Sequence, residues 1–318
     1  MSLAAPLPDV SVIIVNWNTR DLLRGCLQSV LAETRSSTEV IVIDNASADG
    51  SAAMVTAEFP QVLVIANTDN KGFAAANNQG LRIAKGRNLL LLNPDTIILD
   101  GAIDRMLDWL ADHPDVGVAG CQVWETPDRI QLTCFADPGP LNLTIIQMGL
   151  MRLSRLVPAF GHPWYLNWDR LSEKDVDVVS GMFLLVPRAV FDAVGLLDED
   201  FFVYAEEADW CRRIRKAGWR VVFTPVAKII HLDGGAKSTV QIRPKMHVQL
   251  QKSLLIYVRK HNGTLGYWAV KGLMLASSTA RAMVFGAVTL LRGDDVNRAR
   301  VRLSRASLRY LLTGRAPL

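Results

Sequence analysis

The chain has 318 residues, of which 50% are apolar and 21% are charged. That length can bury one large hydrophobic core or two smaller ones, and the composition excludes a disordered or collagen-like chain. The four cysteines stand far apart, without a CxxC pair or a Cys/His cluster, so they favour a reducing compartment over a zinc site or a disulfide framework. Residues 1–10 lack the basic segment and the long apolar run of a secretory signal, so we expect a cytoplasmic protein.

Positive and negative charges are segregated along the chain. Residues 239–318 hold 14 Lys and Arg and only two acids, whereas residues 1–238 hold 21 Lys and Arg against 29 Asp and Glu. This predicts an acidic body followed by a basic, apolar region, which suits an anionic membrane surface or a nucleic acid. No RRM-, KH- or helix-turn-helix-like pattern is present, so the sequence argues against a nucleic-acid partner.

The first half of the chain alternates short apolar runs with helix-like stretches. The apolar runs have the length and β-branched content of buried strands and lie at residues 10–15, 40–43, 62–65 and 89–92. The helix-like stretches lie at residues 22–31, 50–58, 74–85 and 101–112. Fully apolar strands that alternate with helices predict an α/β fold with a parallel sheet covered on both faces.

Polar residues recur where each predicted strand ends. They are Asn16 and Asn18, Asp44 and Asn45, Asn67 and Asn70, and Asn93 and Asp95. Each one alone is explained as a turn former or a helix cap. Ligands of open α/β sheets bind at the carboxyl ends of strands, so four such ends in succession predict a ligand site at this edge.

The segment 67–80 is a loop that turns into a helix rich in small residues. Gly72 permits close approach of another backbone, and the N–H groups at the helix start suit an anion; the alternative is an ordinary glycine turn. No G-x-G-x-x-G follows the first strand and no G-x-x-x-x-G-K-[ST] occurs, which argues against an NAD-linked or P-loop enzyme.

Three features further along the chain are compatible with two roles each. Asp95 can cap a helix or hold a divalent cation against a diphosphate. Glu206 and Glu207 can stabilise a helix N-terminus or provide a carboxylate with a raised pKa for general-base work. His231 can be a metal ligand or a buried histidine. The residue types alone leave all three open.

Seven motifs follow one another along the chain: VSVIIVNWN, VIVIDNASADGS, NKGFAAANNQGL, LLLLNPDT, VSGMFLLVPR, FFVYAEEADWCRRIRKAGWRVVFTP and IIHLDGG. In this order they resemble the family 2 inverting glycosyltransferases of the GT-A fold, and most of all the rhamnosyltransferase-like branch. The resemblance covers roughly residues 8–260. It implies a Rossmann-like, mostly parallel sheet flanked by helices, followed here by a C-terminal helical extension.

The resemblance also implies a set of site residues. The nucleotide-sugar pocket would be formed by Asn16, Asn18, Asp44, Asn45, Asn70, Gly72, Phe73, Asn77, Asn93 and Asp95. Among them, Asp44 matches the contact to the nucleotide base, and Asn93 stands where many members have the first Asp of a DXD motif. Asp95 and His231 match the ligands of a Mg²⁺ or Mn²⁺ ion. Trp168 and Gly181 are assigned to the acceptor side.

The Glu-Asp catalytic pair of the family corresponds to Glu206 and Glu207. The implied base is Glu207, or Glu206 if the longer side chain at position 207 shifts the role. The base would deprotonate the acceptor hydroxyl, which attacks the anomeric carbon from the face opposite the nucleotide. The reaction is expected to be a single displacement with inversion, in which the cation and helix N-termini stabilise the departing diphosphate.

We expect residues 1–240 to form the catalytic domain and residues 241–318 a basic amphipathic helical region for membrane association. Residues 267–291 are apolar but interrupted by Lys271 and Arg281, and the uncharged runs fall short of the ~20 residues that span a bilayer. Helices lying in the membrane interface are therefore expected, with a solvated charged face or an oligomer contact as the alternative. A last helix would carry one row of arginines, formed by Arg298, Arg302, Arg305 and Arg309.

Together these features predict an enzyme that transfers L-rhamnose from dTDP-rhamnose to a polyprenyl-diphosphate-linked or polysaccharide acceptor in cell-envelope glycan synthesis. It would act peripherally on the inner face of the cell membrane. The alternatives are a UDP- or GDP-sugar donor, or a non-catalytic sugar-nucleotide-binding domain at the membrane. The sequence leaves homo-oligomer formation open.

Overall fold

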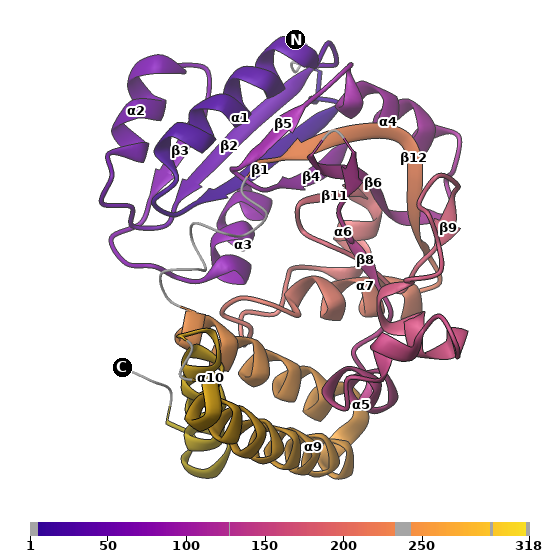
Figure 1. Cartoon of the computed structure of the whole chain (residues 1–318). Coiled ribbons are helices and arrows are strands. Elements are labelled where there is room, and N and C mark those ends of the chain that lie inside the picture. The colour runs from indigo at the N-terminus through magenta and orange to yellow at the C-terminus, as the bar shows by residue number, and fades with distance from the viewer. Residues whose placement is uncertain (1–5, 127, 233–242, 293–294, 316–318) are drawn as a thin grey trace. The chain divides into compact units, whose positions relative to one another are not determined.

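The computed structural model describes residues 6–126, 128–232, 243–292 and 295–315 (Figure 1). The chain divides into two compact units. Unit 1 comprises Met1–Phe135, Trp168–Phe202 and Glu206–Gly234, and unit 2 comprises Ala136–Asn167, Val203–Ala205 and Gly235–Leu318. The domain boundary expected between residues 240 and 241 falls outside the described residues.

The first half of unit 1 has the predicted alternation of strands and helices. In chain order the elements are β1 (Val10–Asn16), α1 (Arg20–Glu33), β2 (Thr38–Asp44), α2 (Ser51–Glu58), β3 (Leu63–Ala66), α3 (Phe73–Ile83), β4 (Asn88–Leu92), β5 (Thr96–Ile98) and α4 (Ala102–Ala111). The four predicted strands and four predicted helices are confirmed to within a few residues. The three-residue strand β5 was not predicted, because it is too short to show a pattern.

The second half of unit 1 is less regular. Its elements are β6 (Val116–Thr126), β7 (Arg129–Ile130), β8 (Cys134–Phe135), β9 (Lys174–Asp175), β10 (Val178–Val179), β11 (Phe183–Pro187), α6 (Arg188–Val194), α7 (Glu206–Lys216) and β12 (Arg220–His231). The four cysteines are free and buried, so the prediction of no disulfide framework is confirmed.

The main sheet has the strand order β3-β2-β1-β4-β11-β6-β12-β5, with β7 paired to β6 and β9 paired to β12. The pairs among β1 to β4 and the pair β6–β12 are parallel. Strand β11 runs antiparallel between β4 and β6, and β5 runs antiparallel to β12. The expected mostly parallel sheet is confirmed, and the apolar runs alone could not show which of its strands are antiparallel.

Helices cover both faces of the sheet at β1. Val12 and Ile14 belong to the core formed with Leu23 and Leu27 of α1. On the opposite face, a Cβ atom at Gly80 of α3 would lie 2.6 Å from Ile13 Cγ2, so only glycine lets this helix pack so closely. The predicted burial on both faces is confirmed for β1, whereas the edge strand β3 is only partly buried, with Leu63 50% exposed.

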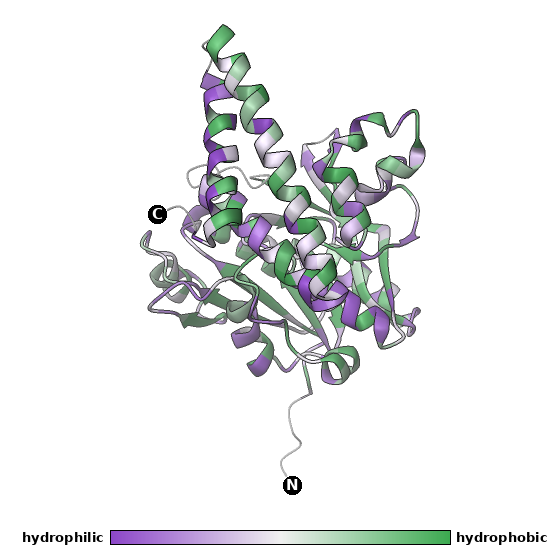
Figure 2. Ribbon diagram, turned by 90° about the horizontal axis from the view of Figure 1, so that it is seen from below, coloured by the Kyte–Doolittle hydropathy of each residue, from purple (hydrophilic) through white to green (hydrophobic). Residues whose placement is uncertain are grey.

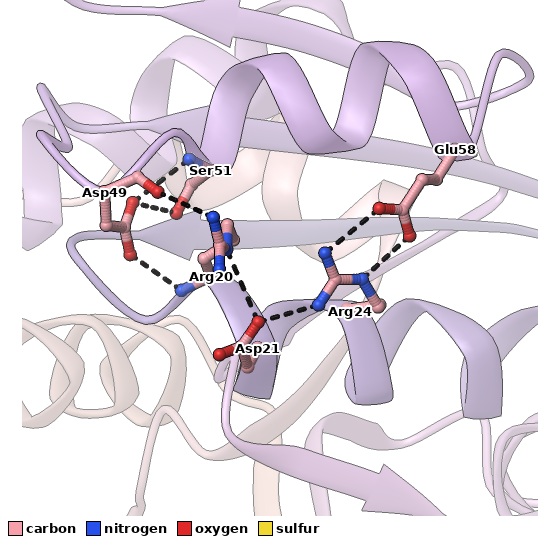
Figure 3. A network of polar contacts seen from close by, with 6 residues as sticks. All are labelled: Arg20, Asp21, Arg24, Asp49, Ser51 and Glu58. Atoms are coloured by element: carbon pink, nitrogen blue, oxygen red, sulfur yellow. Dashed lines mark hydrogen bonds and ion pairs between the residues drawn. The ribbon is translucent and has the colours of Figure 1, made fainter.

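A network of polar side chains joins the first turns of α1 to both ends of α2 (Figure 3). Arg24 makes a bidentate pair with Glu58, with N···O distances of 2.7 and 3.0 Å. Because these side chains are partly exposed, the pair stabilises the fold little. Asp49 matters more, because its Oδ2 accepts the Arg20 backbone N–H at 2.8 Å and fixes the loop that follows β2.

Unit 2 is mostly helical. It contains α5 (Pro140–Gln147), η1 (Leu150–Leu153), η2 (Pro158–Trp164), α9 (Arg243–Arg292) and α10 (Asp295–Thr313). Helix α9 is interrupted at Gly263, whose φ of 72° is left-handed, and α10 packs along α9 (Figure 1). The four predicted row arginines of α10 are exposed, while its other face buries Asn297, Ser304, Ser307 and Leu311.

Much of the ribbon of α9 has the green of hydrophobic residues (Figure 2). The segment Pro244–Leu291 is the one helix in the described part of the chain that is long and apolar enough to cross a membrane by length and composition. Only 11% of its most apolar window is buried, so the apolar residues of that window are largely exposed.

Two glycines that precede helices allow a matched stability test. Gly72 and Gly50 both have left-handed φ, but a Cβ at Gly72 would lie 2.4 Å from Phe202 O, whereas a Cβ at Gly50 meets nothing within 4 Å. We expect Gly50→Ala to cost about 1 kcal/mol of unfolding free energy, as a backbone effect alone. Gly72→Ala should cost at least about twice as much, measured by urea unfolding; equal costs would contradict the close packing of Gly72.

Candidate active site

Asp95 and His231, far apart in sequence, lie side by side at one edge of the sheet. The antiparallel register pairs His231 at the end of β12 with Thr96 of β5, and the Leu232 N–H donates to Asp95 O at 2.9 Å. His231 Nε2 lies 3.0 Å from Asp95 Oδ1. The structure thus brings together the two residues that were expected to hold a cation.

The other ring nitrogen of His231 fixes the orientation of this pair. His231 Nδ1 lies 3.0 Å from Gln131 Oε1. An amide oxygen only accepts hydrogen bonds, so this contact is a hydrogen bond when Nδ1 carries the proton, and in that neutral tautomer Nε2 has a free lone pair. Asp95 Oδ1 is buried and has no other hydrogen-bond partner. In the neutral tautomer a cation between Oδ1 and Nε2 would have one electron pair from each.

This donor set suits a hard or borderline divalent cation, because it combines a carboxylate oxygen with an imidazole nitrogen. The described residues contain no group of three or more His, Cys, Asp or Glu side chains that would hold a metal ion by themselves. A cation at Asp95 and His231 would thus need further ligands from water or from a bound molecule, such as a diphosphate.

The ends of β1 and β2 form a first polar cluster. Asp44 Oδ1 accepts from Asn16 Nδ2 at 2.9 Å, and Asp44 Oδ2 accepts from the Ser47 N–H at 3.1 Å. The Ser47 hydroxyl accepts from the Asn18 N–H at 2.9 Å, and Asn18 Oδ1 accepts from the Ala48 N–H at 2.7 Å. Both predicted Asn residues and Asp44 therefore lie in one cluster.

Asn45 forms a second cluster with the loop before α3. Its Nδ2 donates to Asn70 Oδ1 at 2.9 Å and to Gly72 O at 3.2 Å, while its Oδ1 accepts from Asn67 Nδ2 at 3.1 Å. Asn67 and Gln79 exchange two further amide hydrogen bonds, of 2.9 and 3.0 Å. These bonds give the loop a defined shape, so Asn45 and Asn70 are brought together as expected.

The start of α3 packs against the segment that precedes α7. Phe73 N–H donates to Phe202 O at 2.5 Å. The expected close approach at Gly72 is therefore confirmed. The first N–H of α3 is taken by Phe202 O, so the anion site predicted for this helix start would have to use the N–H groups after it. A Cβ at Gly181 would lie 3.3 Å from the Phe73 ring, which places these two predicted residues in contact.

The turn between β10 and β11, which contains Gly181, also contacts the residue that follows β4. Asn93 N–H donates to the carbonyl of Met182, the residue after Gly181, at 3.2 Å. Asn93 O in turn accepts from the Thr96 hydroxyl at 2.7 Å. The turn between β10 and β11 thus contacts both the start of α3 and the loop that carries Asp95.

Glu206 and Glu207 begin α7, which packs against β10. Glu206 is buried with 3% of its surface exposed, whereas Glu207 is half-buried. The Oε2 atoms of both side chains accept no hydrogen bond. Burial raises the pKa of both carboxyl groups, and the charge of Glu207 raises the pKa of Glu206 further. A carboxylate with a raised pKa can take a proton at neutral pH.

Asn77 and Trp168, two predicted site residues, make contacts that give each of them a structural role. Asn77 is buried, and its Nδ2 donates to Phe73 O at 2.9 Å within α3. Trp168 packs edge-on against Phe223, with ring centroids 4.8 Å apart, and Lys174 Nζ lies 5.6 Å from its ring centroid. Phe223 lies eight positions before His231 on β12, so Trp168 is not placed beside the Asp95–His231 pair. Its acceptor role stays a prediction.

The comparison with protein families bears on residues 11–132, which match the model of glycosyl transferase family 2. These residues contain β1 to β7, with the two polar clusters and Asp95. The chain is a glycosyltransferase with a family 2 domain.

Curated relatives agree with this assignment. An N-acetylglucosaminyl-diphospho-decaprenol L-rhamnosyltransferase of Mycobacterium tuberculosis is 28% identical over 236 residues, which are 69% of this chain and 75% of that protein. The O-antigen biosynthesis protein RfbC of Myxococcus xanthus is 27% identical over 249 residues, which are 72% of this chain but 18% of that protein. The glycosyltransferase is thus rhamnosyltransferase-like, and its relatives include proteins of cell-envelope polysaccharide synthesis.

Solved structures confirm the fold. A mannosyltransferase of Pyrobaculum calidifontis, in complex with GDP-Man and Mn²⁺, superposes with a TM-score of 0.52 at 17% identity and covers 98% of this chain and 89% of that chain. GalNAc-T7 with UDP, GalNAc and Mn²⁺ gives a TM-score of 0.53 at 17% identity over 73% of this chain and 45% of that chain. The predicted GT-A-like α/β fold with a C-terminal helical extension is confirmed.

Sequence analysis missed the residues that orient the predicted ones. They are Ser47, Gln79 and Gln131. Ser47 follows a strand end closely enough that a search for turn residues would have found it. Gln131 gave no such signal, because its contact with His231 depends on the pairing of strands far apart in sequence.

The buried glutamates give a pH-dependent stability. The unfolded chain releases these protons near the ordinary pKa of 4.5, whereas the folded protein retains them to higher pH. Unfolding free energy should therefore fall as pH rises above 4.5, by up to about 1.4 kcal/mol per pH unit for each group. Glu206→Gln should flatten this dependence in urea unfolding between pH 5 and 8.

Glu199→Gln is the matched control. Hydrogen bonds from Asn78 and Arg82 lower the pKa of this partly exposed carboxyl, so its contribution is lost only as pH falls. It should leave the slope between pH 5 and 8 unchanged. The same slope in Glu206→Gln and in the unsubstituted protein would show that Glu206 is ionised in the folded state.

Proposed function

We propose that this glycosyltransferase transfers L-rhamnose from dTDP-rhamnose to a polyprenyl-diphosphate-linked acceptor in cell-envelope glycan synthesis, with inversion at the anomeric carbon. The observation that carries the proposal is the pair formed by Asp95 and His231, whose facing lone pairs suit a cation that binds a diphosphate. The Mycobacterium tuberculosis relative supports the choice of sugar and acceptor, since its name specifies an L-rhamnosyltransferase acting on a diphospho-decaprenol.

The donor would bind along the strand ends of unit 1. Asp44, held by Asn16 and Ser47, would accept a hydrogen bond from the base, and Asn18 and Asn45 would line the nucleoside. The loop of Asn70, Gly72 and Phe73, with Asn77 behind it, would border the sugar, as would Asn93. Preformed clusters of this kind lower the entropic cost of binding.

Asp95 and His231 would hold a Mg²⁺ or Mn²⁺ ion, which stabilises the negative charge that develops on the departing diphosphate. The complexes of two structural neighbours with Mn²⁺ support this choice. Gln131 would keep His231 in the tautomer whose Nε2 can act as a ligand.

Glu207 would be the general base, because its side chain is less buried than that of Glu206. Its raised pKa suits removal of a proton from a sugar hydroxyl during attack on the anomeric carbon. Glu206 would keep its own proton and so avoid placing a second charge beside the base. Gly181 and Trp168 remain the candidates for the acceptor side.

Residues 241–318 would attach the enzyme to the inner face of the cell membrane as a region distinct from a catalytic domain of residues 1–240. The exposed arginine row of α10 and the exposed apolar residues of α9 support this. Basic residues near an anionic surface each contribute about 1 kcal/mol. A lipid-linked acceptor would stay in the bilayer while its head group reaches the enzyme.

Thermal shift with a panel of sugar nucleotides, with and without Mn²⁺ or Mg²⁺, tests the donor. We expect dTDP-rhamnose with Mn²⁺ to raise the unfolding temperature most, because a ligand that binds only the folded state stabilises it. A larger shift with a UDP- or GDP-sugar would reject the proposed donor. Binding without turnover on a lipid-linked acceptor would indicate a non-catalytic domain.

Substitution of Gln131 tests the cation site without reference to activity. Gln131→Leu removes the acceptor of the His231 Nδ1 proton, so Mn²⁺ affinity in the presence of dTDP should fall about 10- to 100-fold, as measured by calorimetry or EPR. Gln122→Leu is a control, since Gln122 donates to Arg170 O instead. Equal Mn²⁺ affinities of the two variants would refute the role of Gln131.

The base is tested by a pair of substitutions. Glu207→Gln should lower turnover at least about 100-fold and change dTDP-rhamnose affinity less than about twofold, because the base acts only on the acceptor. Glu206→Gln should retain most of the activity. The reverse pattern, with Glu206→Gln inactive and Glu207→Gln active, would assign the base to Glu206.

A further inference from the structure

A single arginine, Arg281, lies between His261 and Leu291 in the apolar second half of α9. Between His261 and Leu291 the only Lys or Arg side chains are Lys271 and Arg281, and no acid occurs. Lys271 Nζ lies 5.0 Å from the ring centroid of Trp268. Ionisable residues in an apolar helix are costly and usually mark a binding function. Arg281 therefore needs an explanation that the membrane attachment of α9 does not provide.

Arg281 is held in place by α5. Its Nη2 donates to Gln147 O at 2.8 Å and lies 3.5 Å from Gln147 Oε1. The Ser277 hydroxyl donates to the same Gln147 Oε1 at 3.1 Å, so the amide side chain is itself oriented. The guanidinium is thereby fixed while part of it stays exposed.

A second arginine, Arg152, lies in η1, which packs against α5, the helix whose Gln147 holds Arg281. Arg152 is exposed. Burial lowers the pKa of Arg281, and the positive charge of Arg152 lowers it further. The described residues of unit 2 include only two acids, Asp137 and Asp295, and Asp295 pairs with Arg298 at 3.2 Å. Two neighbouring guanidinium groups here are best stabilised by an anion.

Exposed apolar side chains surround both arginines in the sequence. Met283 and Val284, just after Arg281, are 66% and 57% exposed. Met148 and Leu156, on either side of Arg152, are 61% and 80% exposed. Such residues seek an apolar environment, and their position beside fixed cations suits the boundary between lipid head groups and acyl chains.

We propose that Arg152 and Arg281 bind the diphosphate group of the polyprenyl-linked acceptor at the membrane surface. This inference rests on the proposed function for the identity of the acceptor. Paired guanidinium groups match the oxygens of a diphosphate through bidentate, charge-assisted hydrogen bonds. The flanking apolar side chains would lie in the bilayer beside the prenyl chain.

The same chemistry would bind the phosphate of an ordinary phospholipid, so the test must separate the two sources. Flotation of the full-length protein is measured on three vesicles: phosphatidylcholine alone, with a small fraction of polyprenyl diphosphate, and with phosphatidylglycerol at equal surface charge. The variants are Arg152→Gln/Arg281→Gln and the matched control Arg302→Gln/Arg309→Gln, which removes the same charge from the exposed row of α10.

On polyprenyl diphosphate vesicles, the Arg152/Arg281 variant should bind at least about tenfold more weakly than the control, since charge-assisted hydrogen bonds are lost. On phosphatidylglycerol vesicles the two variants should lose affinity equally, because each loses two charges. Equal binding of the variants to polyprenyl diphosphate vesicles would overturn the site. If the Arg152/Arg281 variant also binds phosphatidylglycerol vesicles at least about tenfold more weakly than the control, the site binds phospholipid head groups, and its assignment to the acceptor is overturned.

Two further measurements keep the result decisive. If the double variant does not fold, Arg152→Gln alone provides the test, because Arg152 is exposed. Arg281→Lys keeps the charge but loses the forked arrangement of N–H donors. Its affinity for polyprenyl diphosphate vesicles should therefore lie between those of the unsubstituted protein and the double variant. Thermal shift with dTDP-rhamnose on the same samples separates this proposal from the proposed donor. If dTDP-rhamnose does not raise the unfolding temperature, the donor is refuted, but a selective loss of binding to polyprenyl diphosphate vesicles would still support the arginine site.

Discussion

The antiparallel pairing of β5 with β12 is the constraint on which the candidate active site depends. It places His231 opposite Thr96, and thereby beside Asp95, although the two residues lie in different halves of unit 1. Without this register, the carboxylate at the end of β4 would be an ordinary turn residue. With it, a carboxylate oxygen and an imidazole nitrogen lie 3.0 Å apart, at a point where both side chains are largely buried.

A second constraint is the absence of a side chain at Gly72. The backbone of Phe202 occupies the space of a Cβ there, and its carbonyl accepts the first N–H of α3. This contact ties the loop that would border the sugar to the segment just before the glutamate pair. Gly181 and Met182 add contacts to Phe73 and Asn93. The site is therefore assembled from backbone contacts as much as from polar side chains.

Much of the fold could be predicted from local patterns. Buried parallel strands require continuous apolar runs, and these located β1 to β4 within a few residues. The antiparallel insertion of β11 could not be predicted in this way, because its apolar run FLLVP looks the same in either direction. Polar strand ends indicated a ligand site, but the roles of Asp95, Glu207 and His231 came from the family resemblance. Gln131 left no local signal at all.

Burial of the Glu206 and Glu207 carboxyl groups, whose Oε2 atoms accept no hydrogen bond, lowers stability at neutral pH, which is typical of residues selected for chemistry. The central claim is that Glu207 and the Asp95–His231 pair act on the same anomeric carbon. A crystal structure with Mn²⁺ and dTDP-rhamnose tests it most directly. The account predicts Mn²⁺ at Asp95 Oδ1 and His231 Nε2, with the anomeric carbon facing Glu207. A cation bound elsewhere, or a sugar turned away from Glu207, would contradict it.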